Sequence, residues 1–356
     1  MRDDKGHARV RERILALPGH LRDQLSCALP APPPGLREHG LLATGVGSSE
    51  AAARYLVQLC NRAGIPAEFQ PLSFFYGQIS LPPENPPYLA LFSQGLSPNA
   101  GIVLEQRQPF AGTLLFTAST PEGQRRAGKP GRAACLEMLT AEGSTLILHP
   151  LENEYEILPR FVGPLCAMFA VALFMEQAAP GSLGGPAMLN SVPDCVERVE
   201  LPPLPEWVED LQPGLSFWFT QTVSQYAQNL SCKLLETLFL PPPTLGDLLA
   251  FSHGAFQLSM LRPSPHWIFC TRDPVEQQLL NKLLPLYNRT GTYKIIESPL
   301  PAPLSVFYFE AYLNQLLLQA LEGSGVNLIQ WPGKGMDGEG YGLCSPGIPP
   351  GISPRI

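Results

Sequence analysis

Apolar positions in the first part of the chain form short continuous runs that are followed by apolar residues at helical spacing. Leu41 to Ala43 make one such run, and Ala52, Tyr55 and Leu59 then fall on one face of a helix. A short continuous run predicts a buried strand, and the 3.6-residue spacing predicts a helix. Residues 41–63 are therefore expected to fold as strand, tight turn and helix.

The same pattern continues along most of the chain. It predicts further strands at residues 67–69, 88–92, 113–117, 145–149, 215–219, 267–271 and 293–296. It predicts further helices at 100–106, 132–140, 161–178, 223–239, 245–256, 275–286 and 304–321. Two short helices within 7–29, separated at Pro18, are expected to pack on the first domain. Strands that alternate with helices predict an α/β fold with mainly parallel sheets.

The turn between the first strand and its helix has the composition of an anion-binding site. Gly45 and Gly47 let the backbone approach a ligand closely, and the first amides of a helix have no partner within it. The helix dipole adds roughly half a positive charge at this end. Ser48 and Ser49 contribute two hydroxyl donors. An ordinary strand-to-helix turn, with one of these serines as N-cap, is the alternative.

Hydroxyl-rich turns also follow the next two buried strands. Ser93 to Asn99 comes after the run at 88–92, and Thr117 to Thr120 ends the run at 113–117. In an open parallel sheet the carboxyl ends of the strands lie along one edge, where ligands bind. The sequence therefore predicts an anion-binding edge built from three turns, with three ordinary polar turns as the alternative.

The charge of the chain is modest and evenly spread. Charged residues make up 15% of the sequence, the net charge is -7, and no run of Lys or Arg is longer than two. This distribution argues against a nucleic-acid surface, which needs clustered positive charge. Any anionic ligand must therefore be held by local donors.

Cysteines and histidines show no spacing typical of a disulfide framework or a metal site. The eight cysteines include no CxxC pair, and the six histidines lack metal-ligand spacing. The chain begins without an apolar signal core, and its longest apolar run, 162–175, contains Gly163 and Pro164 and is too short to cross a bilayer. We therefore expect reduced thiols, no metal and a cytoplasmic protein without a membrane segment. Residues 180–213, rich in proline and glycine with little periodicity, predict a linker.

Candidates for proton transfer lie mainly in the second half. Glu236 stands near the end of a predicted helix, and His253 follows it on the next. A carboxylate and an imidazole brought to one pocket can act as acid and base, since burial or a neighbour tunes either pKa toward neutrality. A structural histidine and a solvated glutamate are the alternative. Among Glu152, Glu154 and Glu156, which usually would form a solvated loop, one is a further candidate to face a substrate.

Two motifs resemble a known domain. GVGSSEAAARYL at 45–56 and SQGLSPN at 93–99, with the hydroxyl turn after the third strand, resemble the sugar isomerase (SIS) domain, a flavodoxin-like α/β unit. Two in tandem, with Glu and His in the second, are similar to the isomerase half of glutamine-fructose-6-phosphate amidotransferase and to the archaeal-type bifunctional phosphoglucose/phosphomannose isomerase. The resemblance implies two three-layer α/β/α domains with mainly parallel sheets. The implied parts are a helical leader 1–35, SIS domain 36–180, linker 181–213, second SIS domain 214–338 and a Pro/Gly-rich tail 339–356.

The resemblance also assigns phosphate-binding residues. The family's first phosphate loop and its second, Ser-Gln-Ser-Gly-x-Thr/Ser, both have counterparts, but the Ser between Gln and Gly is missing from the second. The expected phosphate-binding residues are Gly47, Ser48, Ser49, Ser93, Gln94, Gly95, Ser97 and Thr120.

Catalytic residues are implied in the same way. The family's isomerisation Glu falls on Glu236, and its ring-opening His falls on His253. The segment GKGMD resembles a C-terminal Lys-Gly-x-Asp motif, which makes Lys334 a candidate for substrate contact, together with the glutamates above. The catalytic Lys expected after this motif is not found, because Cys344 and Ser345 stand there.

The activity implied by the resemblance is aldose-ketose isomerisation of hexose 6-phosphates. His253 would open the sugar ring and Glu236 would carry a proton between C1 and C2 through an enediolate, with no metal or redox cofactor, in a homodimer. A non-catalytic phosphosugar-binding or regulatory protein is the alternative, favoured by the missing Ser and Lys. Dinucleotide binding is disfavoured, because GVGSSE lacks the third glycine of GxGxxG.

Overall fold

The structure is a computed structural model in which the chain forms two compact units. The described residues are 4–77, 79, 81, 84–149, 151, 154–200, 210–211, 213–220, 226–291, 293–336 and 340. The first unit takes its described residues from Asp23–Glu154, Gly163–Leu189 and Pro332–Ile356. The second unit takes them from Met1–Arg22, Tyr155–Val162 and Asn190–Trp331. Each unit contains one parallel sheet, and each is described by itself.

The first unit is built on a five-stranded parallel sheet in the order β2-β1-β3-β4-β5. Its strands are β1 (Leu41–Thr44), β2 (Ala67–Phe69), β3 (Tyr88–Phe92), β4 (Thr113–Thr117) and β5 (Thr145–Leu148). This is the flavodoxin-like order, in which the chain reverses direction across the sheet between the first and third strands. The predicted fold class and the positions of these strands are confirmed. Continuous apolar runs suit them because β1, β3 and β4 are covered on both faces.

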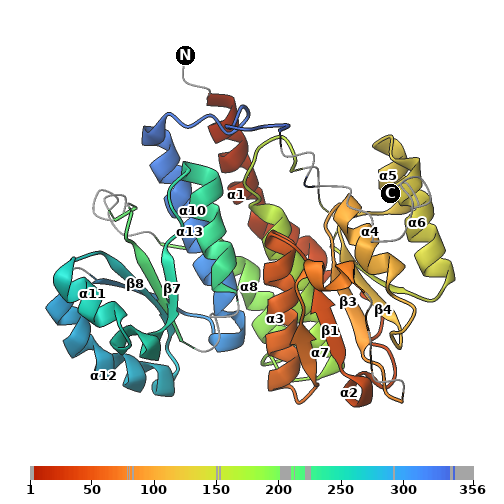
Figure 1. Ribbon diagram of the computed structural model, residues 1–356, viewed down its shortest axis with the longest axis horizontal. Helices are drawn as coiled ribbons and strands as arrows, with labels where there is room; N and C mark the ends of the chain where they lie inside the picture. Colours follow the sequence, from red (N-terminus) through yellow and green to blue (C-terminus); the bar gives the residue numbers. More distant parts are fainter. Residues whose placement is uncertain are drawn as a thin grey trace. The chain divides into compact units, whose positions relative to one another are not determined.

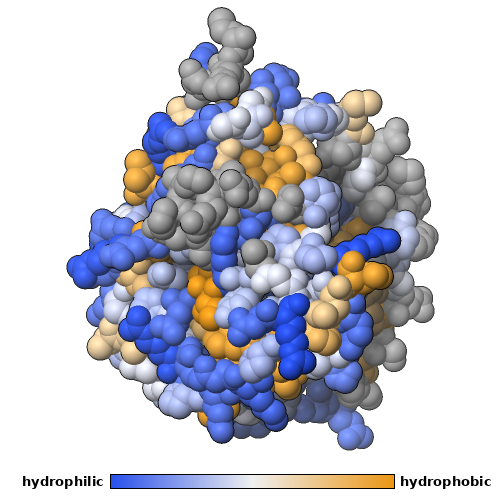
Figure 2. Space-filling model, turned by 90° about the vertical axis from the view of Figure 1, so that its left-hand side faces the viewer, coloured by the Kyte–Doolittle hydropathy of each residue, from blue (hydrophilic) through white to orange (hydrophobic). Residues whose placement is uncertain are grey.

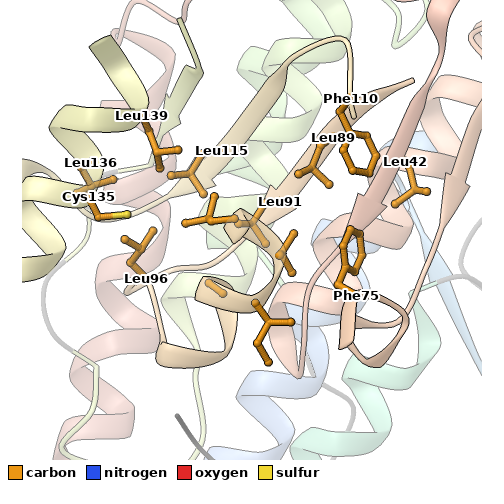
Figure 3. Packing of buried hydrophobic residues seen from close by; sticks show 14 residues of the cluster. Leu42, Phe75, Leu89, Leu91, Leu96, Phe110, Leu115, Cys135, Leu136 and Leu139 are labelled. Atoms are coloured by element: carbon orange, nitrogen blue, oxygen red, sulfur yellow. The ribbon is translucent and has the colours of Figure 1, made fainter. Parts of the chain in front are cut away.

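Helices cover both faces of the first sheet (Figure 1). One face carries α4 (Pro98–Glu105), α6 (Pro130–Ala141) and the 3-10 helix η1 (Leu72–Tyr76). Figure 3 shows how Leu89, Leu91 and Leu115 from the strands meet Leu136 and Leu139 from α6 in this layer. The short helices of this unit are α2 (Leu36–His39) and α5 (Pro121–Arg126).

The other face of the first sheet packs against α3 (Ser48–Arg62) and α7 (Val162–Ala178). The ring of Phe116 stacks on Phe92 at 4.3 Å between centroids and meets Phe174 of α7 edge-on at 5.7 Å. Cys60 of α3 contacts Met175 of α7, with 3.4 Å between their sulfur atoms. These contacts complete three α/β/α layers. They also fix the N-termini of α3 and α7 near the ends of the strands.

The second unit repeats the scheme with four parallel strands in the order β7-β6-β8-β9. The strands are β6 (Ser216–Phe219), β7 (Thr244–Asp247), β8 (His266–Thr271) and β9 (Tyr293–Ser298). The remaining elements are η2 (Leu248–Ser252), α8 (Pro186–Glu197), α10 (Ala227–Leu238), α11 (Ala255–Leu261), α12 (Pro274–Thr290), η3 (Ala302–Leu304) and α13 (Ser305–Ser324).

Aromatic rings fill both faces of the second sheet. On one face Trp218 and Phe251 pack with Tyr287 of α12, whose ring stacks on Phe251 at 3.9 Å. On the other face Phe269 meets Phe309 of α13 edge-on at 5.3 Å. Figure 2 views the chain from the side that carries α11 and α12, and apolar surface there lies between hydrophilic areas. No described helix is long and apolar enough to cross a membrane.

The N-terminal helix differs from its prediction in two respects. The structure has one helix, α1 (Asp4–Leu25), that runs through Pro18, where two short helices were expected. Val10, Ile14, Leu17 and Leu21 keep helical spacing across the proline and are all buried, so their packing offsets the lost backbone hydrogen bond. The expected packing on the first domain holds only for the end of the helix, where Gln24 Nε2 donates to the Cys166 carbonyl of α7 at 3.2 Å, whereas Val10 and Ile14 belong to a core with α13 of the second unit.

One further prediction fails in the second half, and the predicted linker contains a helix. Residues 245–256 form β7, η2 and the start of α11, whereas one helix was expected. Strand β7 pairs with β6 beside Trp218, and a Cβ at Gly246 would lie 2.3 Å from the Trp218 ring. Only glycine therefore fits at this position of β7. Helix α8 lies within the segment 180–213 that was expected to be an irregular linker. Its apolar Leu189, Val192 and Val196 are buried at helical spacing.

A buried ionic network joins α10 to α13 in the second unit. Lys233 and Glu310 are 3% and 0% exposed and form an ion pair. Lys233 Nζ also donates to Asn314 Oδ1 at 2.6 Å, and Asn229 Nδ2 donates to Glu310 Oε2 at 3.1 Å. Tyr226 donates its hydroxyl hydrogen to the same carboxylate, and burial raises the pKa of Tyr226 well above its usual value. The network satisfies both charges inside the helix interface.

Replacing Lys233 with methionine is expected to destabilise the protein by about 3–5 kcal/mol, because it leaves the Glu310 carboxylate buried without its cation. The double variant Lys233→Met/Glu310→Gln is expected to recover much of this loss, since neither charge then remains. Urea denaturation followed by circular dichroism measures both. Equal stability of Lys233→Met and the wild type would contradict the role given to this pair.

Candidate functional site

A hollow opens at the carboxyl edge of the first sheet, beside the reversal between β1 and β3. It is lined by Ser48, Ser49, Phe92, Ser93, Gln94, Phe116, His149, Gly163, Pro164 and Ala167. It brings together four of the predicted residues, Ser48, Ser49, Ser93 and Gln94.

The first turn places two serines at the start of α3. Gly47 is the N-cap of α3 with φ 62°, and it has no side chain to cap the helix, so Ser48 and Ser49 occupy the first helical positions. The alternative of a serine N-cap is therefore wrong. Gly45 allows a close approach, since a Cβ there would lie 2.7 Å from the carbonyl oxygen of Ser49. The Ser49 amide donates within the turn to the Val46 carbonyl at 3.3 Å, so the start of α3 meets the hollow mainly with its two serine side chains and the positive end of the helix dipole.

The second turn uses its polar groups to hold itself together. Ser93 Oγ accepts a hydrogen bond from the Ser97 amide at 3.1 Å. The carbonyl oxygen of Gln94 accepts from the hydroxyls of Thr117 at 3.3 Å and Ser119 at 3.2 Å. Left-handed backbone falls on Leu96, with φ 51°, a conformation that favours glycine. The turn is therefore closed by internal bonds despite its altered sequence.

Three other predicted phosphate-binding residues, Gly95, Ser97 and Thr120, have structural roles within the chain. The carbonyl oxygen of Gly95 accepts a hydrogen bond from Arg132 Nη1 at 2.8 Å. Ser97 is the N-cap of α4, and Thr120 caps α5 by accepting from the Gly123 amide at 3.1 Å. Among the described residues that line the hollow, neither Gly95, Ser97 nor Thr120 is present.

Glu154 is a buried residue at the start of α7. Its carboxylate, 2% exposed, accepts a hydrogen bond from the Gly163 amide at 2.7 Å. A Cβ on Gly163 would lie 2.5 Å from Gln94 Oε1 and 2.8 Å from Glu154 Oε2, so both side chains would have to shift to accommodate it. The solvated loop expected for this glutamate is thus wrong, and its charge already compensates the dipole of α7. Its neighbour Glu152 lies outside the described residues.

His149 is the residue of the hollow that the sequence did not single out. It follows β5 directly, is 1% exposed, and lines the hollow with neither ring nitrogen bonded to any described residue. Burial lowers the pKa of His149 to about 4, so the ring is neutral near pH 7. The three turns were predicted because they follow the carboxyl ends of strands in a parallel sheet. His149 could have been predicted in the same way, because it follows the carboxyl end of β5.

Glu236 and His253 lie in the second unit. Glu236 is half-buried near the end of α10, and burial raises its pKa against the opposing charges of Arg160 and Lys233. His253 follows η2 and is exposed. Lys334 is an exposed residue of the first unit. A raised carboxyl pKa is a property that general bases share, although structural groups show it as well.

The carboxyl edge of the second sheet holds a buried carboxylate, that of Glu276. This buried side chain of α12 accepts from Thr220 Oγ1 at 2.5 Å and from the amide and hydroxyl of Thr271 at 2.8 and 2.7 Å. Thr220 and Thr271 stand at the carboxyl ends of β6 and β8. A carboxylate of the chain itself therefore occupies the edge where an anion would bind.

Known proteins share the fold of this chain. The C-terminal domain of glucosamine-fructose-6-phosphate aminotransferase from Francisella tularensis has a TM-score of 0.68 at 13% identity, covering 90% of this chain and 98% of that one. Tagatose-6-phosphate ketose/aldose isomerase from Escherichia coli has a TM-score of 0.65 at 16% identity, covering 91% and 97%. Glucosamine-6-phosphate deaminase from Thermotoga maritima has a TM-score of 0.65 at 14% identity, with the same coverage. No model of a protein family and no curated protein matches the sequence.

These similarities confirm the class of fold, a flavodoxin-like α/β architecture with parallel sheets. Both chains are covered almost completely, so the likeness extends over both sheets of this protein. Among the described residues no group of three or more His, Cys, Asp or Glu side chains is arranged to hold a metal ion.

Gly45→Ala is expected to destabilise the protein by about 1–3 kcal/mol, because the new methyl group would press on backbone atoms of Ser49 that cannot move independently. The matched control is Gly77→Ala, since nothing lies within 4 Å of a Cβ at Gly77 and its φ is not left-handed. The control is expected to be neutral or slightly stabilising. Thermal denaturation compares the two, and equal effects would contradict the close approach at Gly45.

The stability of the protein is expected to fall as pH drops from 7 to 5, in part through His149. Because its folded pKa of about 4 lies below the ordinary value of 6.5, stability is full above pH 6.5 and is lost as the unfolded chain takes up a proton. The loss between pH 7 and 5 amounts to about 2 kcal/mol. His149→Phe should lose that much less than the wild type in urea denaturation at the two pH values. Identical losses would show that this ring is not held neutral.

Proposed function

We propose that the protein binds a phosphorylated sugar in the hollow at the carboxyl edge of the first sheet and isomerises it between aldose and ketose forms. The observation that carries the proposal is the convergence of Ser48, Ser49, Ser93 and Gln94 at one opening, beside the start of α3. Parallel α/β sheets bind ligands at this place, and a helix N-terminus favours a phosphate.

The hollow suits an ester phosphate held by neutral donors. The residues that line it include no Lys or Arg, so the amides of α3, the serine hydroxyls and the Gln94 amide would supply the hydrogen bonds. Each bond between such a donor and a charged oxygen contributes about 1.5–3 kcal/mol. The solved proteins of the same fold include enzymes of tagatose 6-phosphate and glucosamine 6-phosphate, which supports a phosphosugar as the ligand class.

The reaction would consist of proton transfers alone. His253 would move the proton of the anomeric hydroxyl to the ring oxygen, which opens the sugar. Glu236 would then remove the proton from C2, and the electron pair of that bond would form the C1–C2 double bond as the carbonyl oxygen at C1 takes a proton. Loss of the proton from the C2 hydroxyl would form the new carbonyl at C2 while the double-bond electron pair takes the proton back from Glu236 at C1, which gives the ketose. The raised pKa of Glu236 suits this role, because a base works best near the operating pH.

A non-catalytic phosphosugar-binding protein is the second candidate. It is favoured by the second turn, where hydroxyls of Ser93, Thr117 and Ser119 bond to the chain itself, and by the exposure of His253. We propose a homodimer in the cytoplasm for either function, with no metal or redox cofactor, and sedimentation velocity tests the dimer.

Glu236→Gln is expected to lower the rate of aldose-ketose exchange by at least about 100-fold, because general-base catalysis contributes 10²–10⁴ in rate. The measurement is deuterium incorporation at C2 of glucose 6-phosphate in D₂O by proton NMR. Binding of the sugar phosphate, followed by thermal shift, should be unchanged. Glu322→Gln, which alters an exposed glutamate paired with Arg11, is the matched control and should keep the wild-type rate.

Two outcomes separate the candidates. Unchanged deuterium incorporation in Glu236→Gln would remove this residue from the reaction. A thermal shift of the wild type with glucose 6-phosphate, but without any incorporation or turnover, would select the binding protein over the isomerase.

A further inference from the structure

His149 is a buried imidazole that makes no hydrogen bond with any described residue, although it lines an opening. Neither Nδ1 nor Nε2 has a partner, and the side chain is 1% exposed. His266 offers a comparison, because it is equally buried, but its Nδ1 accepts a hydrogen bond from Trp218 Nε1 at 3.3 Å and its ring packs among aromatic rings. Leaving two buried polar atoms unpaired is costly, so the His149 ring needs a partner that the described residues do not supply.

The protonation state of the ring limits what that partner can be. Because burial keeps His149 neutral near pH 7, one ring nitrogen donates a hydrogen bond and the other accepts one. A group that offers only acceptors, as a fully ionised phosphate does, would satisfy one nitrogen alone. A sugar hydroxyl both donates and accepts, and two neighbouring hydroxyls would satisfy both nitrogens.

The position of His149 separates it from the predicted phosphate seat. Ser48 and Ser49 follow β1, whereas His149 follows β5, and β3 and β4 lie between these strands. Three strand spacings amount to about 14 Å at the ends of the strands. Side chains that converge from both sides narrow this distance, so an elongated ligand is needed to reach both ends of the hollow.

Charge sets the direction in which such a ligand would lie. The Glu154 carboxylate caps α7 at Gly163, and Gly163 lines the hollow on the side of that helix. A phosphate placed beside this carboxylate would meet like charge, whereas the start of α3 carries Gly47, Ser48 and Ser49 and no acidic residue before Glu50. The charged end of the ligand therefore belongs at α3, and the uncharged end at His149.

We propose that His149 is a specificity-determining residue that binds hydroxyl groups of a phosphorylated polyol whose phosphate lies at Ser48 and Ser49. The inference rests on the proposed function, because it assumes that the hollow binds a phosphorylated sugar. It adds that selection of the sugar over inorganic phosphate takes place at the end of β5, through a residue that plays no part in holding the phosphate.

Calorimetric titration of the full chain with inorganic phosphate and with glucose 6-phosphate tests this division. The wild type is expected to bind the sugar phosphate more tightly than inorganic phosphate. In His149→Phe the affinity for glucose 6-phosphate should fall by about tenfold to hundredfold, the effect of losing hydrogen bonds to a buried neutral partner. The affinity for inorganic phosphate should stay as in the wild type. His266→Phe, the matched loss of a buried histidine, should alter neither.

A second measurement works on the wild type and does not depend on a variant that folds. With ¹⁵N-labelled histidine, the ring nitrogens of His149 should shift on addition of glucose 6-phosphate and not on addition of inorganic phosphate. The role of His149 would be overturned if the variant lost both affinities equally or lost neither. It would also be overturned if the ring nitrogen signals did not shift on addition of glucose 6-phosphate. Anion binding by the hollow would stand in each of these cases. A wild type that binds neither ligand would overturn the proposed function and this inference together.

Discussion

Parallel pairing is the constraint on which the site depends, because it places the carboxyl ends of all strands at one edge of each sheet. Polar turns and helix N-termini gather there, and every buried polar group among them needs a partner. In the first unit the turns after β3 and β4 solve the problem by bonding to each other through the Gln94 carbonyl. The turn after β1 and His149 do not, and the hollow opens between them.

The two units meet this constraint differently, and one residue makes the difference. Helices α4 and α12 both begin with a cap followed by proline, in Ser97-Pro98-Asn99-Ala100 and in Asp273-Pro274-Val275-Glu276. Where α12 carries Glu276, α4 carries Ala100. The longer acidic side chain reaches Thr220 and Thr271 at the edge of the second sheet, whereas Ala100 is buried in the apolar core of the first unit. In the second unit the Glu276 carboxylate thus supplies the negative charge at this edge of the sheet.

The sequence predicted the sheets well and the partners of polar groups poorly. Continuous apolar runs identified β1, β3 and β4 because these strands are buried on both faces, so apolar residues fill their middles and the threonines Thr44, Thr113 and Thr117 stand at their ends. Strand β7 was missed because its residues are exposed or half-buried, and because Gly246, a residue that is unfavourable in strands, is needed there to leave room for the Trp218 ring. Helix α1 was divided at Pro18 because local propensity counts against proline, whereas tertiary packing decided the outcome. Hydroxyls in turns looked alike in sequence, and only the fold shows which are already bonded.

That distinction bears on the missing serine of the second turn. Because Ser93 Oγ and the Gln94 carbonyl are engaged within the chain, this turn serves as a scaffold, and Leu96 tolerates left-handed backbone there because it is fully buried in the core of the first unit. A serine lost from such a turn removes a donor from the periphery of the hollow, and the start of α3 keeps its own donors. The departure of SQGLSP from the phosphate-loop pattern therefore weighs less against the proposed anion binding than the sequence alone suggested, because we propose that the phosphate lies at the glycine turn before α3.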